Sequence, residues 1–300
     1  MRYRLKRSES PSDGLRRIVS EQIRAALAAT KEGDGAAGAA VHEFRKRLKK
    51  SRAALRLAVG ALSKDRHQRD DRALRRIAKL AGDLRDAHVR LQIVTQLRKQ
   101  FASAEFSDVF QRIEDLLALE LASFAEACAD WGATAAKQLR AAERRISSAP
   151  LDRLTWKQVC SGVAAVYRRG RDQLDRTLRR PTVKNFHDWR RETKNLWYQL
   201  RLLQPLNRTV LEEIAREAGT LSDLLGRHHD FAFLVSRLDL ERDDESLQNA
   251  RAKLTKLIKK RIKRLERDAS ELGRHFYAEA PKAFAKRISI FMKERTGLAK

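Results

Sequence analysis

Apolar residues recur along this chain every three or four positions, with polar residues between them, from about residue 12 to residue 295. That period predicts amphipathic helices, and no stretch shows the strict alternation of a half-buried strand. Sequences typical of turns separate the periodic stretches, among them "KEGDGAAG" at 31–38, "SKD" at 63–65 and "SSAP" at 147–150. The pattern therefore predicts an all-α protein.

The predicted helices fall into two sets of four. The first set covers about 12–30, 41–62, 66–101 and 104–147, and the second about 151–180, 182–204, 208–239 and 243–276. A shorter terminal helix begins near residue 281. Boundaries within the second set come from Pro181, Pro205, "NRT" at 207–209 and "ERDDES" at 241–246.

Two self-similar segments link the two sets. "VHEFRKRLKKSRAALRLA" at 41–58 matches "FHDWRRETKNLWYQLRLL" at 186–203, and "LAGDLRDAHVRL" at 80–91 matches "LLGRHHDFAFL" at 224–234. The offsets are 145 and 144 residues. Two matches in the same order predict a duplicated four-helix unit, with repeat one at 12–149 and repeat two at 150–278. An N-terminal tail, 1–11, and a C-terminal helix, 279–295, complete a single domain.

The segment at 41–58 gathers its charges on one side of a helix. At about 100° per residue, one arc contains His42, Arg45, Lys49, Arg52 and Arg56, with Lys46 beside it. We call this arc the first ladder. The opposite side contains Val41, Phe44, Leu48, Leu55 and Val59. We expect a purely cationic face backed by a packing face.

The segment at 186–203 repeats this arrangement. Its basic arc, the second ladder, contains His187, Arg190, Lys194 and Arg201, flanked by Arg191 and Tyr198. Its packing side contains Phe186, Trp189, Leu196 and Leu200. Asp188 and Glu192 are expected to lie outside the ladder and not to neutralise it through i,i+4 pairs.

The overall charge of the chain indicates what kind of ligand these ladders would bind. The chain has 65 Lys and Arg against 39 Asp and Glu, a formal net charge of +26, which attracts polyanions over long range. Like charges spaced four apart destabilise a helix, so their presence in both copies favours an anion-binding face over an ordinary solvated surface. Each ladder would be about 20 Å long, which suits an extended polyanion. No glycine-rich phosphate loop is present.

The motif H-x-x-R-[KR]-x-x-K, followed one helix later by G-x-x-x-D and then repeated, resembles the CHAD domain (conserved histidine α-helical domain), over roughly Ser12 to Arg295. The resemblance implies two four-helix bundles related by a pseudo-two-fold axis, with a basic central cavity or channel. It also implies binding of inorganic polyphosphate, in some members on polyphosphate granules. Other members are fused to a triphosphate-tunnel catalytic domain. We expect no such domain here, and therefore binding without catalysis.

The ladders and the resemblance together give the predicted polyphosphate-binding residues. They are His42, Arg45, Lys46, Lys49, Arg52, Arg56, Arg85, His187, Arg190, Arg191, Lys194, Tyr198, Arg201 and His229. Trp197 stands where family members often have a basic residue, which would weaken the second ladder. Arg85 and Asp86 keep the family's Arg-Asp step, whereas His229 replaces the arginine before Asp230. The two aspartates either orient a neighbouring side chain or are ordinary polar groups on a helix face.

His42 and His187 are predicted to have lowered pKa values, because neighbouring cations disfavour the charged imidazolium. As neutral rings they could donate hydrogen bonds to phosphate oxygens. A structural role, bonded to a neighbouring helix, stays open beside this one.

Other features permit fewer conclusions. "RAKLTKLIKKRIKRLERD" at 251–268 has a packing stripe of Leu254, Leu257, Ile258, Ile262 and Leu265. Its basic side could extend the polyanion surface, touch nucleic acid or an anionic membrane, or be a solvated face. His228, His229 and Asp230 are similar to the His-Asp step of metal phosphohydrolases. The matching Arg85-Asp86 cannot bind metal in that way, so we expect no metal site, cofactor or catalytic set.

Cys128 and Cys160 have no metal-binding spacing and are expected to be small core residues. With no apolar leader and no long apolar segment, we expect a soluble cytoplasmic protein without membrane contact. A sequence-independent nucleic-acid binder is the alternative function, and a phosphohydrolase is a third. Nucleic-acid binders often interleave stacking aromatics with cations, and the first ladder has none. Nucleic acid is therefore expected only as a non-specific competitor, and the oligomeric state stays open.

Overall fold

The computed structural model describes residues 3–6, 8–31, 37–149, 151, 153–240 and 245–296, and all its regular elements in those ranges are helical. The α-helices are α1 (Pro11–Ala29), α2 (Ala37–Leu55), α3 (Lys64–Lys79), α4 (Gly82–Gln100), α5 (Ala104–Ala127), α6 (Trp131–Ser147), α7 (Trp156–Arg179), α8 (Val183–Leu203), α9 (Arg208–Leu240), α10 (Gln248–Phe276) and α11 (Pro281–Thr296). Short 3-10 turns are η2 (Arg56–Ala58), η3 (Gln204–Leu206) and η4 (Glu245–Leu247). The all-α prediction is confirmed. Three predicted boundaries fall wholly or partly outside the described residues: residues 32–36 of the turn at 31–38, Pro150, and residues 241–244 of the turn at 241–246.

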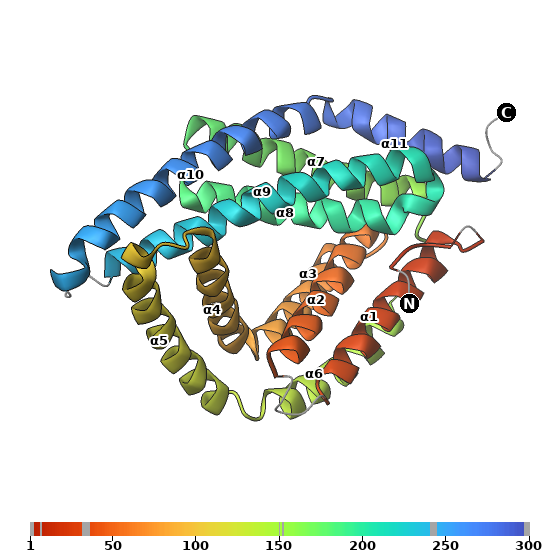
Figure 1. The fold of residues 1–300 in the computed structure, drawn as a ribbon. Coiled ribbons are helices and arrows are strands. Elements are labelled where there is room, and N and C mark those ends of the chain that lie inside the picture. Colours follow the sequence, from red (N-terminus) through yellow and green to blue (C-terminus); the bar gives the residue numbers. More distant parts are fainter. Residues whose placement is uncertain are drawn as a thin grey trace.

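Two predicted helices are each broken in the structure. The expected helix at 66–101 is α3 and α4, separated at Leu80 and Ala81, and the expected helix at 104–147 is α5 and α6, separated at 128–130. Apolar residues continue across both junctions and no proline marks them, so periodicity could not locate the breaks. At the first junction, Gly82 is a poor helix former, and α4 restarts there at a changed angle (Figure 1).

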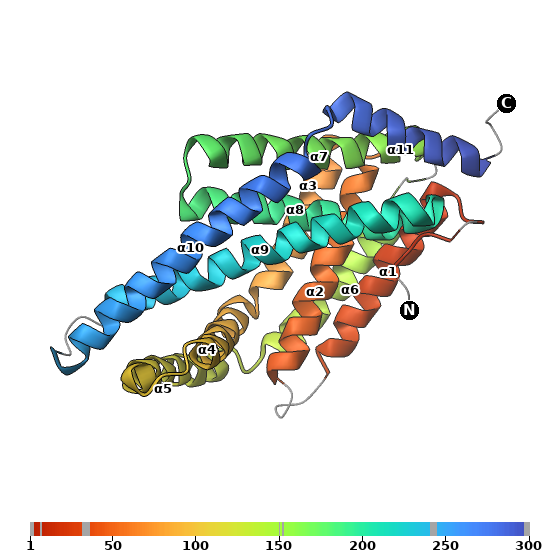
Figure 2. The same ribbon diagram turned by 45° about the horizontal axis from the view of Figure 1, so that its top comes forward.

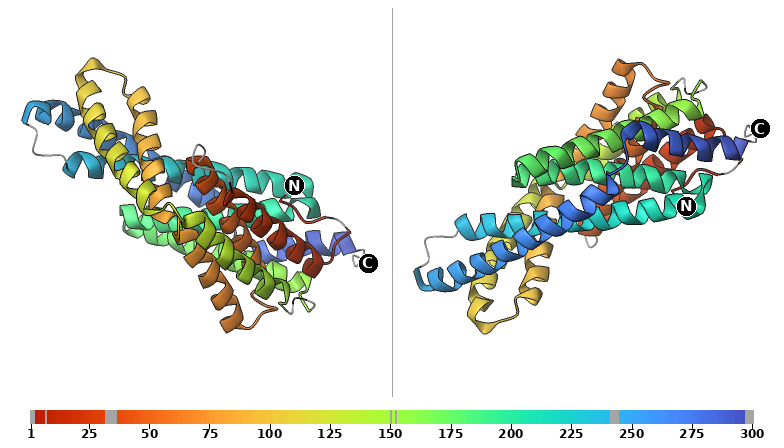
Figure 3. Two further views of the ribbon diagram at one scale, coloured as in Figure 1. Left: turned by 90° about the horizontal axis from the view of Figure 1, so that it is seen from below. Right: turned by 90° about the horizontal axis from the view of Figure 1, so that it is seen from above.

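The helices of the second half, α7–α11, lie together along one side of the molecule, and those of the first half lie beneath them (Figure 1). Within the second half α8 packs against α7 and α9, α10 against α9, and α11 against α7. The first half makes two groups, one of α1, α2, α3 and α6 and one of α4 and α5 (Figure 2). The pair α4 and α5 lies beside α9 and α10 (Figure 3), whereas α2 crosses against α8.

The apolar core does not divide at the middle of the chain. One large cluster joins α1–α3 and α6 to α7–α9 and α11, and includes Phe44 and Trp189. A second joins α4 and α5 to α9 and α10, and includes Phe110 and Phe231. Each of these two clusters combines both halves, so the two sequence repeats fold into one unit rather than into two separately filled bundles.

The predicted packing sides of the two ladder helices are buried, with one exception. Val41, Phe44, Leu48, Leu55, Phe186, Trp189, Leu196 and Leu200 are buried. Val59 is 46% exposed, contrary to the prediction. The α-helix ends at Leu55 and the chain continues as the tighter turn η2, which shifts the phase of the residues that follow.

The predicted N-terminal tail is partly packed. Tyr3 and Leu5 are buried. The Tyr3 hydroxyl donates to the Lys50 carbonyl at 3.0 Å, and the Leu5 amide donates to the Leu202 carbonyl at 3.0 Å. Because Lys50 is on α2 and Leu202 on α8, this segment joins the two ladder helices.

The remaining sequence predictions have mixed outcomes. On α10, Leu254, Ile258 and Leu265 are buried and Ile262 is partly buried, whereas Leu257 is 44% exposed because it lies at the edge of the stripe. Cys160 is buried as expected, with its Sγ 3.0 Å from Met292 Sδ. Cys128 is only half-buried, at the end of α5. Throughout the described ranges, each helix is too short or too polar to cross a bilayer.

Candidate anion-binding site

An arginine and a glycine form the same contact in both repeats. A Cβ placed on Gly82 of α4 would lie 3.2 Å from Arg45 Nη1 on α2. A Cβ placed on Gly226 of α9 would lie 3.4 Å from Arg190 Nε on α8. In each repeat the glycine of the G-x-x-x-D step leaves room for the guanidinium of the ladder arginine. The sequence match located these residues but did not show that they touch.

The helix break beside Gly82 also serves Arg45. The Arg45 Nη1 donates to the Ala78 carbonyl at 3.3 Å, near the end of α3, where the helix leaves carbonyls without helical partners. Arg45 Nη2 donates to Asp86 Oδ1 at 3.3 Å. Asp86 therefore orients a ladder arginine, which decides between the two roles that the sequence left open for it.

Each histidine contacts the same position of the helix that carries the G-x-x-x-D step, α4 for His42 and α9 for His187. Arg85 Nη2 lies 2.8 Å from His42 Nδ1, and the ring of His229, which stands where Arg85 does, lies 5.1 Å from the ring of His187. An arginine always donates, so Nδ1 of His42 accepts and the ring proton is on Nε2. His42 is accordingly neutral, with its second nitrogen free to donate.

The expected lowering of the histidine pKa values is confirmed in direction. Burial lowers the pKa of His42 first, followed by the charges of Arg85 and Lys46. Burial also leads for His187, followed by Arg190. The sequence argument relied on the neighbouring cations alone, whereas desolvation is the larger cause.

The two ladders meet at Lys49. Its side chain reaches solvent, yet protein surrounds it on most sides. Burial, together with the charges of Arg45 and Arg190, lowers the pKa of Lys49 to about 8, although the charge of Asp86 opposes the shift. Arg190 comes from the other repeat. The helices touch directly nearby, where Gln199 Nε2 donates to the Ala53 carbonyl at 3.2 Å.

Contacts between α4 and α9 also bring together the helices that carry the two G-x-x-x-D steps. Burial, followed by the charges of His187 and Arg190, lowers the pKa of His229 to about 4, while the charge of Asp86 from the first repeat opposes the shift. Burial raises the pKa of Asp230 to about 6, and Arg190 opposes that rise. We call Arg45, Lys49, Arg85, Arg190 and His229 the central cluster.

The expected purely cationic face is wrong at several positions. Arg52 Nε and Nη2 donate to Asp71 of α3 at 2.8 and 2.9 Å, and Arg56 lies 3.8 Å from the same carboxylate. Lys46 pairs with Glu43 at 2.9 Å. Asp71 is a neighbour only in space, so the helical wheel could not include it.

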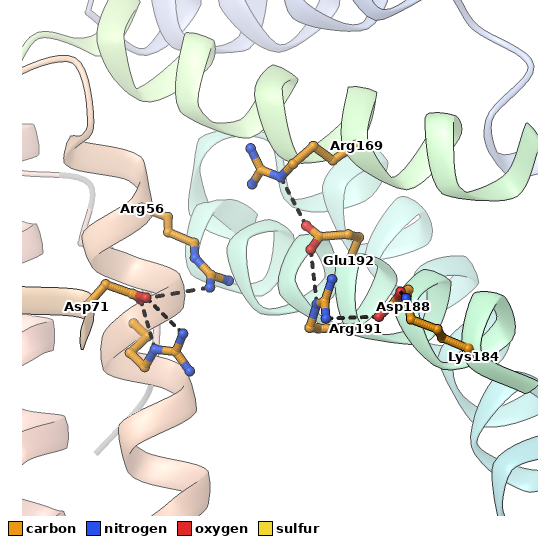
Figure 4. A network of polar contacts seen from close by, with 8 residues as sticks. Arg56, Asp71, Arg169, Lys184, Asp188, Arg191 and Glu192 are labelled. Carbon is orange, nitrogen blue, oxygen red and sulfur yellow. Dashed lines mark hydrogen bonds and ion pairs between the residues drawn. The ribbon is translucent and has the colours of Figure 1, made fainter. Parts of the chain in front are cut away.

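The second ladder contains a similar exception. As expected, Asp188 and Glu192 form no i,i+4 pair with a ladder cation among the described residues, yet Arg191, which flanks the ladder, pairs with Asp188 at 3.0 Å and with Glu192 at 3.4 Å (Figure 4). The long arginine side chain reaches carboxylates at i−3 and i+1. Within the described part of the chain, the ladder cations without an ion pair are Lys49, Arg190, Lys194 and Arg201.

Trp197 holds two of these cations. Lys194 Nζ lies 4.2 Å and Arg201 Cζ lies 4.7 Å from the centre of its ring, both within the range of a cation–π contact. The departure from the family pattern thus positions charges that are already present. Tyr198 is only 6% exposed and packs edge-on against Tyr3 at 6.3 Å, so its predicted place on the binding face is wrong.

The family model of the CHAD domain matches residues 17–239. The chain belongs to the CHAD domain family. The crystal structure of the CHAD domain from the plant Ricinus communis aligns with a TM-score of 0.64 at 19% identity, covering 92% of this chain and 96% of that one. The likeness shows that the fold is shared. No curated protein matches this sequence.

Of the two adjacent histidines on α9, only His229 belongs to the CHAD motif, and His228 has a different role. His228 is buried, stacks on Phe186 at 4.2 Å between ring centres, and places Nε2 3.2 Å from Glu266 Oε1. It is a packing residue between α8 and α10. Among the described residues, there is no group of three or more His, Cys, Asp or Glu arranged to hold a metal ion.

Sequence reasoning missed Arg169 of this CHAD domain. Its Nε donates to Glu192 Oε2 at 3.1 Å, and its side chain is 48% exposed. Arg169 lies on α7, outside both copies of the motif, and no spacing in the sequence connects it with the ladders.

Proposed function

We propose that this CHAD domain binds inorganic polyphosphate, without catalysis, through a basic face contributed by both helical repeats. The observation that carries the proposal is the meeting of Lys49 with Arg190. Cations from two matching helices lie close enough to lower the pKa of Lys49, and within the described residues neither forms an ion pair, since the charge of Asp86 acts on Lys49 only from a distance.

Uncompensated cations at one place destabilise the free protein by mutual repulsion. A ligand with closely spaced negative charges reduces that repulsion, and it raises the lowered pKa of Lys49 again. Arginine supplies a planar fork for phosphate oxygens, and lysine supplies a mobile point charge. The free Nε2–H of neutral His42 adds a donor that is not a fixed charge.

A pseudo-two-fold relation between the repeats around a basic cavity is part of this proposal, with the six helices α1–α6 in place of the four expected in repeat one. Its support is that the arginine–glycine contact and the histidine contact occur once in each repeat. A polymer held along both ladders would place successive phosphates against matching residues. Association with polyphosphate granules would follow from the same binding.

A competition experiment separates this proposal from sequence-independent nucleic-acid binding. Labelled polyphosphate is bound at about 150 mM salt, because affinities of this kind depend steeply on salt, and unlabelled duplex DNA is added in excess of matched charge. We expect the polyphosphate to remain bound. Displacement by duplex would contradict the proposal.

Substitution tests the location of the site. Lys49→Gln combined with Arg190→Gln removes two cations of the central cluster. The matched control is Lys256→Gln combined with Lys260→Gln, two exposed lysines on the outer face of α10. We expect the first pair to weaken binding at least about tenfold more than the second, since each charged hydrogen bond contributes roughly 1.5–3 kcal/mol. Equal losses would mean that net charge alone matters.

A further inference from the structure

A second group of arginines lies where α2, α3, α7 and α8 meet (Figure 4). From the first half, Arg52 and Arg56 are held by Asp71. From the second half, Arg169 and Arg191 are held by Glu192, at 3.1 and 3.4 Å. Arg191 is held in addition by Asp188, at 3.0 Å. Three carboxylates therefore hold four guanidinium groups that come from both halves of the chain.

The two parts of this group act on each other. Arg56 is subject not only to Asp71 and Arg52 beside it but also to the charges of Glu192 and Arg169 from the second half. Figure 4 shows its guanidinium between Asp71 and Glu192. The group is thus continuous across the contact between the halves.

The cations of the second half face solvent and the carboxylates lie behind them. The side chains of Arg169 and Arg191 are 48% and 55% exposed, whereas that of Glu192 is 11% exposed. Each guanidinium has five N–H donors, and the ion pairs with Glu192 and, for Arg191, with Asp188 use only part of them. The remaining donors of two oriented, exposed arginines are available to phosphate oxygens.

The group continues the first ladder. Arg45, Lys49, Arg52 and Arg56 follow one side of α2 into η2. Arg56 comes seven residues after Lys49, which is about 10 Å along a helix. A polymer that fills the central cluster reaches Arg56 and Arg169 only if it is long enough to continue past it.

We propose that Arg56, Arg169 and Arg191 form an extension subsite that binds the further phosphates of a long polyphosphate, with Asp71 and Glu192 as the residues that position it. This inference rests on the proposed function of the central cluster. It assigns a binding role to Arg169, which lies outside the repeated motif, and a chain-length preference to the protein.

The test compares tripolyphosphate with long-chain polyphosphate at fixed salt, by calorimetry on the full chain. The variant is Arg169→Ala, and the matched control is Arg168→Ala, the exposed neighbour that carries the same charge on the same helix. We expect Arg169→Ala to weaken long-chain affinity about tenfold and to leave tripolyphosphate affinity unchanged. Arg168→Ala should leave both nearly unchanged.

The outcomes distinguish the two proposals. If Arg169→Ala weakens long-chain binding no more than Arg168→Ala does, or weakens both ligands equally, the extension subsite is wrong while the central site stands. If the unmodified protein binds neither ligand, both proposals are wrong. Because Arg169 is half exposed, its truncation should not unfold the protein, and thermal unfolding of both variants checks this.

Discussion

Arg85 donates a hydrogen bond to His42 Nδ1 at 2.8 Å and thereby fixes the neutral tautomer of the histidine. In the second repeat, the corresponding position is occupied by His229, whose ring contacts that of His187 instead. The two repeats therefore place a histidine against the same position of the G-x-x-x-D helix, α4 or α9, through different chemistry. The first repeat uses a permanent charge, and the second a ring whose pKa is lowered to about 4 by burial and nearby charges.

This contact predicts the titration of His42. Its pKa in the folded protein lies below the usual value of 6.5, so the unfolded chain binds the proton more readily. The stability contributed by the neutral ring is therefore present above about pH 6.5 and is lost as the pH falls through the lower folded value. Histidine NMR should show a folded pKa below 6.5 with the proton on Nε2.

Ligand should reverse this shift. A bound polyanion opposes the field of Arg85 and Lys46, so the His42 pKa should rise in the complex. A signal of His42 that titrates identically with and without polyphosphate would argue for a purely structural histidine.

The lowered pKa of Lys49 predicts that polyphosphate affinity also depends on pH, in a higher range than the titration of His42. With a pKa of about 8, it loses its charge between pH 7 and 9, and polyphosphate affinity should fall over that range. Lys49→Arg keeps the charge throughout, so its affinity profile should be flatter. Lys256→Arg on the outer face of α10 is the control and should retain the slope of the unmodified protein. A profile unchanged by Lys49→Arg would remove this lysine from the site.

Replacing Trp197 should lower the affinity for polyphosphate without changing the net charge of the protein. Trp197→Ala frees Lys194 and Arg201 from cation–π contacts that contribute roughly 0.5–1 kcal/mol each. The two side chains would then be less ordered, and polyphosphate affinity should fall about threefold to tenfold while net charge is constant. Thermal unfolding separates this effect from misfolding. An affinity at or above that of the unmodified protein would show that Trp197 only reduces the charge of the second ladder, as the family pattern implied.

Gly273 of α10 packs against the buried side of α8, the helix that carries the second ladder. A Cβ on this α10 residue would lie 2.4 Å from Trp189, the fully buried residue beside Arg190 on α8. Alanine favours a helix over glycine by up to about 1 kcal/mol, but overpacking typically costs about 1–3 kcal/mol. Gly273→Ala should therefore lower the free energy of unfolding, measured by urea denaturation. A stabilised variant would show that Trp189 moves aside freely.

Several features of this protein could be predicted from sequence. The helical period, the two matching segments and the ladder positions are local patterns, and the burial of Phe44, Leu48, Trp189 and Leu200 follows from them. The breaks at Leu80 and 128–130 were not predictable in this way, because apolar residues continue across them. Tyr198 was misplaced because only the packed N-terminal segment, with Tyr3, shows that its side of α8 is covered.

The sequence by itself determined which residues form each ladder, because positions along one helix are fixed by its 3.6-residue turn. Only the tertiary structure decided which of those charges are compensated, since Asp71 reaches Arg52 from another helix, and within the described residues no carboxylate pairs with Lys49 or Arg190. The sequence likewise shows that Gly82 and Gly226 occupy matching positions, but only the tertiary structure shows that the guanidinium groups of Arg45 and Arg190 pack on them. Electrostatic interactions depend on distance in space, and distances between helices are set by core packing, which no local pattern contains.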